Sequence, residues 1–561
     1  MNHRRWKILP TVPPQCLAGM DISPIAAQLL YNRGVTESAQ AEAFFGGGEG
    51  LQGDPFLLAD MEKAVARVYR ALLGGESIAV YGDFDADGIC GTALLVQGLS
   101  LLGGRAIIPY IPHRVQEGYG LNEAALEKLA KQGVTLVITV DCGISNIAEV
   151  DYARSKGLDV VITDHHTVLQ GLPSALAVVN PKRTGSRYPF PQLAGVGVAF
   201  KLLQALFQTL GRRVMPEDIF DIIAIGTVAD MVPLLGENRY LVKRGLRTLK
   251  NTHRLGLQEM LRVARCPSES PTSGDISWTI APRLNSPGRL DHAIASYELL
   301  VTDSCDEARQ MAEELEETNG QRQRLTKEFF VKAKEQLAIS GIASPLLMVG
   351  GEGYPQGVAG LVAGKLAEEF YRPSIVIETG EETSRGSGRS IAEFDMIAAL
   401  AKCHDILLRF GGHPMAAGFT VPNQNLTLLR QRLVEVAARQ LATVDLQPFL
   451  TVEAEIPLAA VNGTVFQVVE KFAPFGSGNP VPLFLSRRVK VVDCYTTGNG
   501  SQHLKLKVKQ GGIVWRGIGF DLGHLLAEVT PEVDIVYHLS VDRWGGEDTL
   551  ALNILDFAPV R

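Results

Sequence analysis

Three aspartates follow a short apolar run, and their spacing suggests a cation site. Residues 78–81 are apolar and lead directly into Asp83, Asp85 and Asp87, which are followed by Gly88. If this stretch stays extended, the three carboxylates point the same way and repel one another, because side chains alternate across a strand. A divalent cation would offset the repulsion, since hard cations prefer carboxylate oxygens. The alternative is an acidic turn that faces solvent.

Two further apolar runs also end in polar side chains. Asp141 follows one run, and Asp164, His165 and His166 follow the next. Ligands of parallel α/β sheets bind where the strands end, so we expect these groups at the same edge as the three aspartates. Asp230 follows a predicted helix, where a carboxylate opposes the helix dipole unless a cation compensates it.

Each of these residues also has a structural interpretation. Asp141 could cap the helix that follows it. The pair His165 and His166 could be hydrogen-bonded to Asp164 for structural reasons alone. Cys142 is expected to be a small packed residue and neither a ligand nor a nucleophile.

The elements that position these residues alternate between strands and helices from Ser77 onwards. Buried strands separated by helices predict a mostly parallel sheet with both faces covered. The predicted strands are 78–81, 106–110, 136–140, 159–163 and 177–179, and helices are predicted at 93–102, 122–131 and 218–229.

A long polar helix and a second α/β unit follow. The helix is expected to begin after Asp303 as its cap and to run to about residue 337, which spans about 50 Å. A bridge between domains is favoured over a coiled-coil dimer, because the apolar seam includes Thr318 and Arg322. The second unit is predicted to contain strands at 346–349 and 374–377, a helix at 357–370, and glycine-rich loops at 385–390 and 411–413.

The two ends of the chain differ in character from the middle. Residues 1–75 are predicted to form a helical preface, with Asp60 as the N-cap of a helix over 61–73. The last part has short alternating runs that predict an all-β barrel or sandwich. The predicted domains are the preface 1–75, a catalytic domain 76–300, the connecting helix 301–340, a substrate-binding domain 341–446 and a β domain 447–561.

The cysteine content and the net charge limit the cellular compartment and the ligands expected for this chain. Its seven cysteines include no CxxC pair, which favours a reducing compartment and argues against a zinc ribbon. We expect no signal peptide and no membrane span, and therefore a cytoplasmic protein. The net charge of −7 means that any binding of nucleic acid must rely on a local basic groove.

The ordered motifs are similar to a known superfamily. Residues 83–88, 140–144, 164–166 and 229–233, in this order, resemble the DHH phosphoesterases, and Asp164-His165-His166 matches the namesake triplet. Residues 54–58, 281–289 and 410–418 are similar to the RecJ family of bacterial exonucleases within it.

This resemblance implies a set of site residues and cofactors. It implies two Mn²⁺ or Mg²⁺ ions, with Asp141 as the bridging ligand and His166 facing the scissile phosphate. Asp164 could orient a neighbouring histidine or serve only as a local cap. The implied metal ligands are Asp83, Asp85, Asp87, Asp141, His165 and Asp230. The implied substrate contacts are Asn285, Arg289, Arg389, Gly411, Gly412 and His413, and Arg283 is left open.

The resemblance also implies an OB fold for the β domain. Its basic residues are Lys490, Lys505, Lys507, Lys509 and Arg516. Tyr495 and Trp515 could stack on bases, and core packing is an equal alternative for Trp515.

The implied activity is 5′-to-3′ exonuclease digestion of single-stranded DNA to 5′-mononucleotides. Family analogy adds roles in recombinational repair, mismatch repair and stalled-fork processing, with a helicase and single-strand binding protein as partners of a monomeric enzyme. One alternative is a phosphodiesterase for short oligonucleotides or cyclic dinucleotides. Another is an inactive scaffold that only binds nucleic acid.

Overall fold

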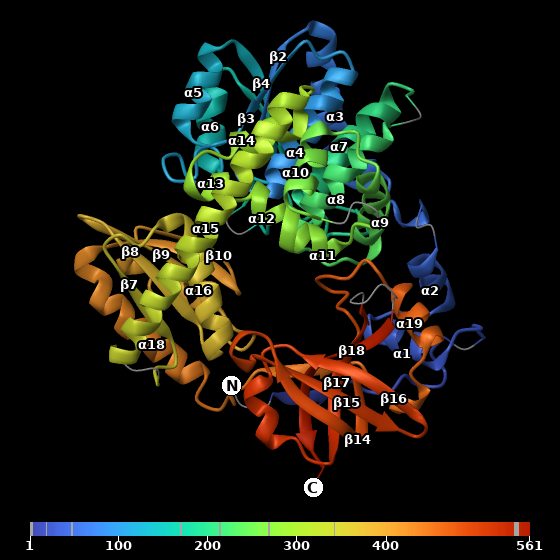
Figure 1. The fold of residues 1–561 in the computed structure, drawn as a ribbon. Coiled ribbons are helices and arrows are strands. Elements are labelled where there is room, and N and C mark those ends of the chain that lie inside the picture. Colours follow the sequence, from blue (N-terminus) through green and yellow to red (C-terminus); the bar gives the residue numbers. More distant parts are fainter. Residues whose placement is uncertain are drawn as a thin grey trace. The chain divides into compact units, whose positions relative to one another are not determined.

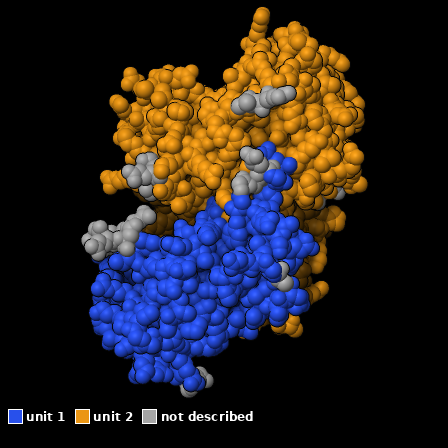
Figure 2. Space-filling view, turned by 90° about the vertical axis from the view of Figure 1, so that its right-hand side faces the viewer, with its two compact units in different colours: residues 1–52, 233–236, 447–561 blue, residues 53–232, 237–446 orange. Residues whose placement is uncertain are grey.

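The computed structural model divides the chain into two compact units, which Figure 2 shows in different colours. It describes residues 4–17, 19–46, 49–168, 171–212, 215–266, 270–340, 343–542 and 549–560. Unit 1 comprises Met1–Gln52, Pro233–Gly236 and Gln447–Arg561, and unit 2 comprises Gly53–Val232 and Glu237–Leu446. The predicted preface 1–75 is therefore divided between the two units.

Unit 2 begins with the predicted parallel sheet, whose strand order is β3-β2-β4-β5-β6. Apolar side chains of α5 and α6 pack on one face of the sheet, and α3, α4 and α7 contact the other. The strands are β2 (Ser77–Gly82), β3 (Ala106–Tyr110), β4 (Val134–Val140), β5 (Asp159–Thr163) and β6 (Ala177–Val179). The helices on the sheet are α3 (Met61–Gly74), α4 (Ala86–Leu101), α5 (Glu123–Lys131), α6 (Ile147–Ser155) and α7 (Gly195–Thr209).

Further helices pack behind α4 and α7. The buried helix α8 (Phe220–Ala229) contacts both of them and ends at Asp230. It is followed by α9 (Gly236–Lys250), α10 (Leu255–Val263), α11 (Ser273–Asp275), α12 (Ala281–Leu284), α13 (Pro287–Leu290) and α14 (Ile294–Val301).

One predicted helix cap is confirmed in position and the other is corrected. Asp60 is the N-cap residue of α3, but its side chain makes no capping hydrogen bond, and its carboxylate pairs with Arg183 at 2.6 Å. The long helix α15 (Cys305–Ser340) is capped by Ser304 rather than Asp303, since the Glu307 amide donates to the Ser304 hydroxyl at 3.3 Å.

Helix α15 connects the parallel-sheet part of unit 2 to a second sheet (Figure 1). It contacts α10, α12, α13 and α14, and further along it contacts α16 (Gln356–Phe370) and β7 (Leu347–Gly351). Its buried positions Ala308, Leu315, Phe329 and Leu337 therefore pack within the chain, as expected for a bridge.

The second sheet has the order β10-β11-β9-β8-β7. Its other strands are β8 (Ser374–Thr379), β9 (Thr383–Arg389), β10 (Arg409–His413) and β11 (Ala416–Pro422), with α17 (Met396–Ala401) and α18 (Leu426–Gln440) beside them. The two predicted glycine-rich loops are thus strands β9 and β10. Gly386 is needed because an added Cβ would lie 2.1 Å from the Phe419 ring.

Unit 1 contains a barrel of the strand order β13-β14-β15-β16-β18-β17, closed by pairing of β14 with β17. The strands are β13 (Ala454–Glu455), β14 (Phe484–Thr497), β15 (His503–Gln510), β16 (Ile513–Gly519), β17 (Glu532–Asp542) and β18 (Thr549–Pro559). Trp515 lies in the core and is 8% exposed, so the stacking alternative is wrong for this residue.

The N-terminal segment belongs to unit 1 because it packs on this barrel. Strand β1 (Arg5–Ile8) pairs in parallel with β12 (Phe449–Val452), and α1 (Pro24–Asn32) contacts α19 (Gly463–Glu470). Helix α2 (Ser38–Phe45) places Phe44 against Phe472. No helix among the described residues is long and apolar enough to span a membrane.

Candidate metal centre

The three aspartates after β2 are placed by a strand-to-helix turn. Asp85 is the N-cap of α4, where its carboxylate accepts from the Asp87 and Gly88 amides at 2.9 and 3.2 Å. Asp87 lies in the first helical turn and accepts from the Gly195 and Val196 amides at the start of α7, at 2.7 and 2.8 Å. Asp85 keeps an extended backbone, but Asp87 is helical, so this stretch does not continue as a strand. Local hydrogen bonds aim the Asp85 carboxylate, and contacts with α7 aim that of Asp87.

Asp141 occupies a strained backbone position at the end of β4. Its φ is +60°, and its amide donates to the Thr163 carbonyl at 3.0 Å. The next helix begins at Ile147 with Asn146 at its N-cap, so the capping alternative for Asp141 is wrong. Nothing in the local secondary structure requires a carboxylate here.

Asp164 is buried and holds the residues that follow it. It accepts from the His165 and His166 amides at 2.7 and 3.0 Å and lies 2.8 Å from His166 Nδ1. Burial alone would raise the pKa of Asp164, but the hydrogen bond from His166 and the charge of that ring lower it to about 2. Asp164 therefore orients His166.

Two residues beside His166 were missed by sequence reasoning. The Tyr119 hydroxyl donates to the Asp141 carbonyl at 3.0 Å and lies 3.2 Å from His166 Nδ1. The Asn180 side chain donates to the His166 carbonyl at 2.9 Å. Both come from loops at the same edge of the sheet, and neither carries a local sequence signal.

The structure brings the six predicted metal ligands together. His165 Nε2 lies 3.0 Å from an Asp141 oxygen and 3.5 Å from an Asp230 oxygen. Three groups each offer ligand atoms within 4.8 Å of one another: Asp141-His165-His166, Asp87-His165-Asp230 and Asp83-Asp85-Asp141. Asp141 and His165 each belong to two groups.

The carboxylates of this cluster are buried close to one another, which raises their pKa values. Burial, followed by the charges of neighbouring carboxylates, raises the pKa values of Asp83, Asp141 and Asp230 well above normal and that of Asp87 to about 7. Burial and the neighbouring His166 lower the pKa of His165 to about 3, which leaves a neutral imidazole.

Several ligand atoms of this cluster are buried without a hydrogen bond in the described part of the chain. They are Asp83 Oδ1, Asp141 Oδ1, Asp230 Oδ2 and both ring nitrogens of His165. Unpaired buried polar atoms are costly, so a compensating group is expected. A mixed set of carboxylates and imidazole without thiolate fits a divalent cation such as Mn²⁺ or Mg²⁺.

Arginines gather next to the carboxylates. Arg289 and Arg389 are half-buried. Arg114, which sequence reasoning missed, belongs to the same group, and its guanidinium carbon lies 4.8 Å from the centroid of the Phe84 ring. Burial lowers the pKa of Arg289 to about 9, and the nearby Arg114, Arg322 and Arg389 add to this. Within the described residues no carboxylate forms an ion pair with Arg114, Arg289 or Arg389, so this group fits an anion.

The other predicted substrate residues have different surroundings. Asn285 accepts from the Ala86 amide at 2.8 Å and supports the start of α4. Arg283, which was left open, pairs with Glu316 of α15 at 2.5 Å. Gly411, Gly412 and His413 lie on β10, and the His413 ring stacks on His166 with centroids 5.7 Å apart. The second sheet therefore reaches the carboxylate cluster.

Comparison with known proteins agrees with this arrangement. Residues 77–227 match the DHH family N-terminal domain, residues 335–439 the DHHA1 domain, and residues 452–556 the RecJ OB domain. The single-stranded-DNA-specific exonuclease RecJ of Bacillus subtilis is 36% identical over 96% of this chain and 68% of its own length. The protein of that name from Dickeya dadantii is 34% identical over 96% of this chain and 97% of its own length.

This chain belongs to the RecJ family. Its structure superposes on the crystal structure of RecJ in complex with Mn²⁺ from Thermus thermophilus with a TM-score of 0.84 at 30% identity, covering 99% of this chain and 80% of that one. A structure of exonuclease RecJ bound to manganese gives a TM-score of 0.60 at 35% identity, covering 69% of this chain and 98% of that one. The fold class is thereby confirmed: DHH and DHHA1 domains with an OB domain.

Proposed function

We propose that this RecJ family member is a metal-dependent exonuclease that degrades single-stranded DNA from its 5′ end to 5′-mononucleotides. The observation that carries the proposal is the set of buried, unpaired carboxylate and imidazole atoms at one sheet edge. The curated relatives are named for this activity, and two related structures contain Mn²⁺.

The proposed ligands of two Mn²⁺ or Mg²⁺ ions are Asp83, Asp85, Asp87, Asp141, His165 and Asp230. Asp141 would be shared by both ions, because it belongs to the group of three aspartates and also to a group with two histidines. When bound, such ions lower the pKa of a water and stabilise the oxygens of an in-line displacement. Asp164 keeps His166 oriented towards the scissile phosphate.

The arginine group supplies the proposed contact with the strand end. Arg114, Arg289 and Arg389, with the Ser387 hydroxyl 3.4 Å from Arg389 Nη1, would bind a terminal phosphate. Arg114 lies over the ring of Phe84, which stands between Asp83 and Asp85 in the chain, so a phosphate bound there would lie next to the carboxylate cluster. This proximity favours release of single nucleotides. The 5′ polarity comes from the family.

The cellular setting is proposed on family grounds. It comprises recombinational repair, mismatch repair and stalled-fork processing by a monomer in the cytoplasm, together with a helicase and a single-strand binding protein. The Asn285, Gly411, Gly412 and His413 contacts with substrate are proposed in the same way.

The test uses single-stranded DNA labelled at either end, with and without Mn²⁺. Immediate release of a mononucleotide from the 5′ label, abolished by chelator and absent on duplex, is the expected result. Asp141→Ala should lower the rate by at least about 1,000-fold, whereas Asp151→Ala, which removes an exposed carboxylate of α6, should not.

Other results would contradict the proposal. Cleavage of very short oligomers alone would indicate a small-substrate phosphodiesterase. Binding without cleavage in any metal would indicate a scaffold. Substantial activity of Asp141→Ala in a folded protein would exclude the two-metal assignment.

A further inference from the structure

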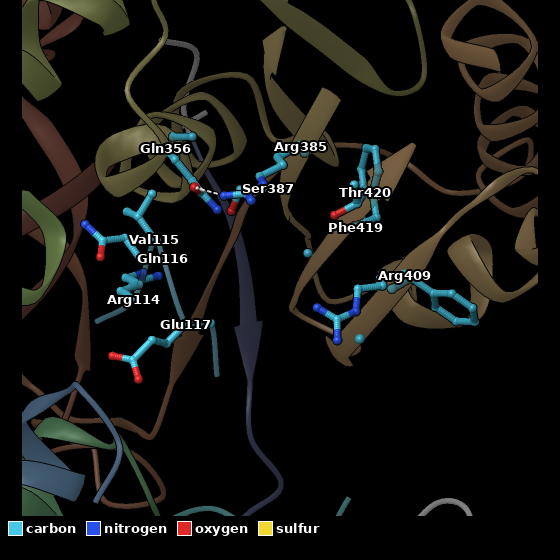
Figure 3. Close-up of a pocket in the computed structure, with 16 residues that line it drawn as sticks. Arg114, Val115, Gln116, Glu117, Gln356, Arg385, Ser387, Arg409, Phe419 and Thr420 are labelled. Atoms are coloured by element: carbon cyan, nitrogen blue, oxygen red, sulfur yellow. Dashed lines mark hydrogen bonds between the residues drawn. The ribbon is translucent and has the colours of Figure 1, made fainter. Parts of the chain in front are cut away.

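A polar cavity lies beside the arginine group in unit 2. It has a volume of about 390 Å³ and is lined by residues 114–118 on one side and by β9, β10 and β11 on the other. Figure 3 shows Arg385 and Arg409 on the strand side, facing the loop that carries Arg114. None of the proposed metal ligands lines this cavity.

The strand register relates this cavity to the carboxylate cluster. Successive cross-strand rows on one face of the sheet are Arg389-Ala416-His413, then Ser387-Gly418-Gly411, then Arg385-Thr420-Arg409. Alternate residues along a strand are about 6.8 Å apart. The first row reaches His166, so the third row lies about 14 Å further along the sheet.

The middle row forms a flat surface, here called the floor, between the two rows that carry arginines. Gly411 and Gly418 have no side chains, and a Cβ added at Gly411 would meet no atom within 4 Å. A ligand that binds Arg389 and Ser387 can therefore continue over this floor towards Arg385 and Arg409. The cavity is continuous with the proposed site of the terminal phosphate, because Ser387 and Arg114 line both.

The charges of the cavity suit an anion. Arg409 is exposed and forms no ion pair within the described residues, and Arg385 donates to the Gln356 side chain at 2.7 Å. Glu117 is the acidic residue of the lining. Its carboxylate accepts from the Tyr110 hydroxyl and the His113 amide, both at 2.6 Å, and points away from the strands in Figure 3. The three positive charges of Arg114, Arg385 and Arg409 therefore exceed the single negative charge of Glu117.

We propose that this cavity is a second phosphate subsite, which holds additional phosphoryl groups attached to the terminal phosphate of the strand. Single strands that carry a 5′-triphosphate would then be substrates. This proposal rests on the proposed function, because Arg389 and Ser387 must first hold the terminal phosphate. Arg385 and Arg409 lie one row beyond Ser387 and two rows beyond Arg389, where their side chains would contact the added phosphoryl groups.

The chemical step is the same as for a 5′-monophosphate end. Water adds to the phosphorus of the first internucleotide phosphate, and the bond from this phosphorus to the 3′ oxygen of the terminal nucleotide breaks. The 3′ oxygen takes a proton, and the first product is a deoxynucleoside 5′-triphosphate. The remaining strand carries a 5′-monophosphate, so the second subsite affects only the first nucleotide released.

The experiment measures release of the first nucleotide from oligodeoxynucleotides with a 5′-triphosphate or a 5′-monophosphate, in Mn²⁺, with products separated by chromatography. The wild type should release a deoxynucleoside triphosphate. The double variant Arg385→Gln/Arg409→Gln should raise KM for the triphosphate strand about 10- to 100-fold, because each arginine provides a charged contact. KM for the monophosphate strand should change less than about twofold.

The matched control is Arg154→Gln/Arg439→Gln, which removes two exposed arginines of α6 and α18 and should leave both KM values unchanged. Failure of the wild type to cut the triphosphate strand, or equal KM changes on both strands, would overturn the proposal. Release of a dinucleotide would show that the cavity holds a further nucleotide instead. Failure to cut the monophosphate strand would reject the proposed function itself.

Discussion

Close packing at individual glycines sets the positions of the carboxylates in the cluster. Gly88 is required because an added Cβ would lie 2.6 Å from the backbone of Asp83. Gly195 leaves room for Asp141 in the same way, since its Cβ would lie 2.5 Å from the Asp141 Cβ. These glycines control the geometry of the site although they offer no ligand atoms.

Gly195→Ala is therefore expected to displace Asp141 and to lower kcat about 10- to 100-fold, because small misplacements of reacting groups are costly. The measurement is steady-state release of nucleotides in saturating Mn²⁺. Gly197→Ala in the same helix is the control, since its Cβ would meet Leu193 only at 3.4 Å. Equal activity of the two variants would contradict the role of Gly195.

Metal binding should also be visible in stability. Mn²⁺ at about 100 times its Kd should stabilise unit 2 by about 2.7 kcal/mol, because it binds the folded state. Asp141→Asn should remove most of this effect and should raise the Tm of the metal-free protein, since one buried like charge is lost. Calorimetry with chelator and with Mn²⁺ tests both, and Asp151→Asn should behave as wild type. An unchanged Mn²⁺ effect in Asp141→Asn would exclude Asp141 as a ligand.

At the scale of elements, α15 determines how the two sheets of unit 2 are connected. Its first half packs on α10 and α12–α14, and its second half packs on α16 and β7. Gly320 lies between these halves, where the helix is continuous and the nearest atom to an added Cβ is Arg324 Nη1 at 3.4 Å. The glycine is therefore not required by packing.

Gly320→Ala should stabilise the protein by about 0.5–1 kcal/mol, since alanine favours helix over glycine by this amount. Denaturant unfolding measures the change, and kcat should stay within about twofold. Gly320→Pro is the contrasting variant, because it removes a helical hydrogen bond and should destabilise by about 3 kcal/mol. Loss of activity in a stable Gly320→Ala protein would show that α15 must bend there.

At the scale of the whole molecule, the barrel of unit 1 carries a local group of lysines although the net charge of the chain is −7. Lys505, Lys507 and Lys509 alternate with buried residues on β15 and so share its outer face. Lys509 lies opposite Lys490 in the register, and Lys505 lies opposite the exposed Tyr495. Like charges directly opposite each other on neighbouring β-strands repel and destabilise the sheet. A bound anionic nucleic acid would offset this repulsion, so the arrangement fits a surface that binds single-stranded DNA.

The triple variant Lys490→Gln/Lys505→Gln/Lys509→Gln should weaken binding of long single strands and reduce the slope of log K against log salt by about 2, or about 0.7 for each lysine. Fluorescence anisotropy at several salt concentrations measures this slope. Lys63→Gln/Lys131→Gln/Lys156→Gln, which changes exposed lysines of unit 2, is the control. An unchanged slope would place the DNA path elsewhere.

The sequence by itself determined the parallel sheet and the residues at its edge. Strands such as β4 and β5 are continuous apolar runs, and their polar ends follow from chain order alone, so Asp141 and Asp164–His166 could be located without a structure. The ordered motifs were also sufficient for the family. Each of these signals lies within a few residues of sequence. Because ligands of parallel α/β sheets bind at the carboxyl ends of the strands, the signals together predict one common site.

The tertiary structure alone decided which side chains meet across long separations. Arg114, Arg289 and Arg389 come from three different elements, and only packing places them together. The predicted glycine-rich loops are strands β9 and β10, in which Gly386 and Gly412 allow close approach to Phe419 and Ala417 of the neighbouring strand. Pairing of β1 with β12 joins residues more than 400 positions apart, and no local pattern encodes such a contact.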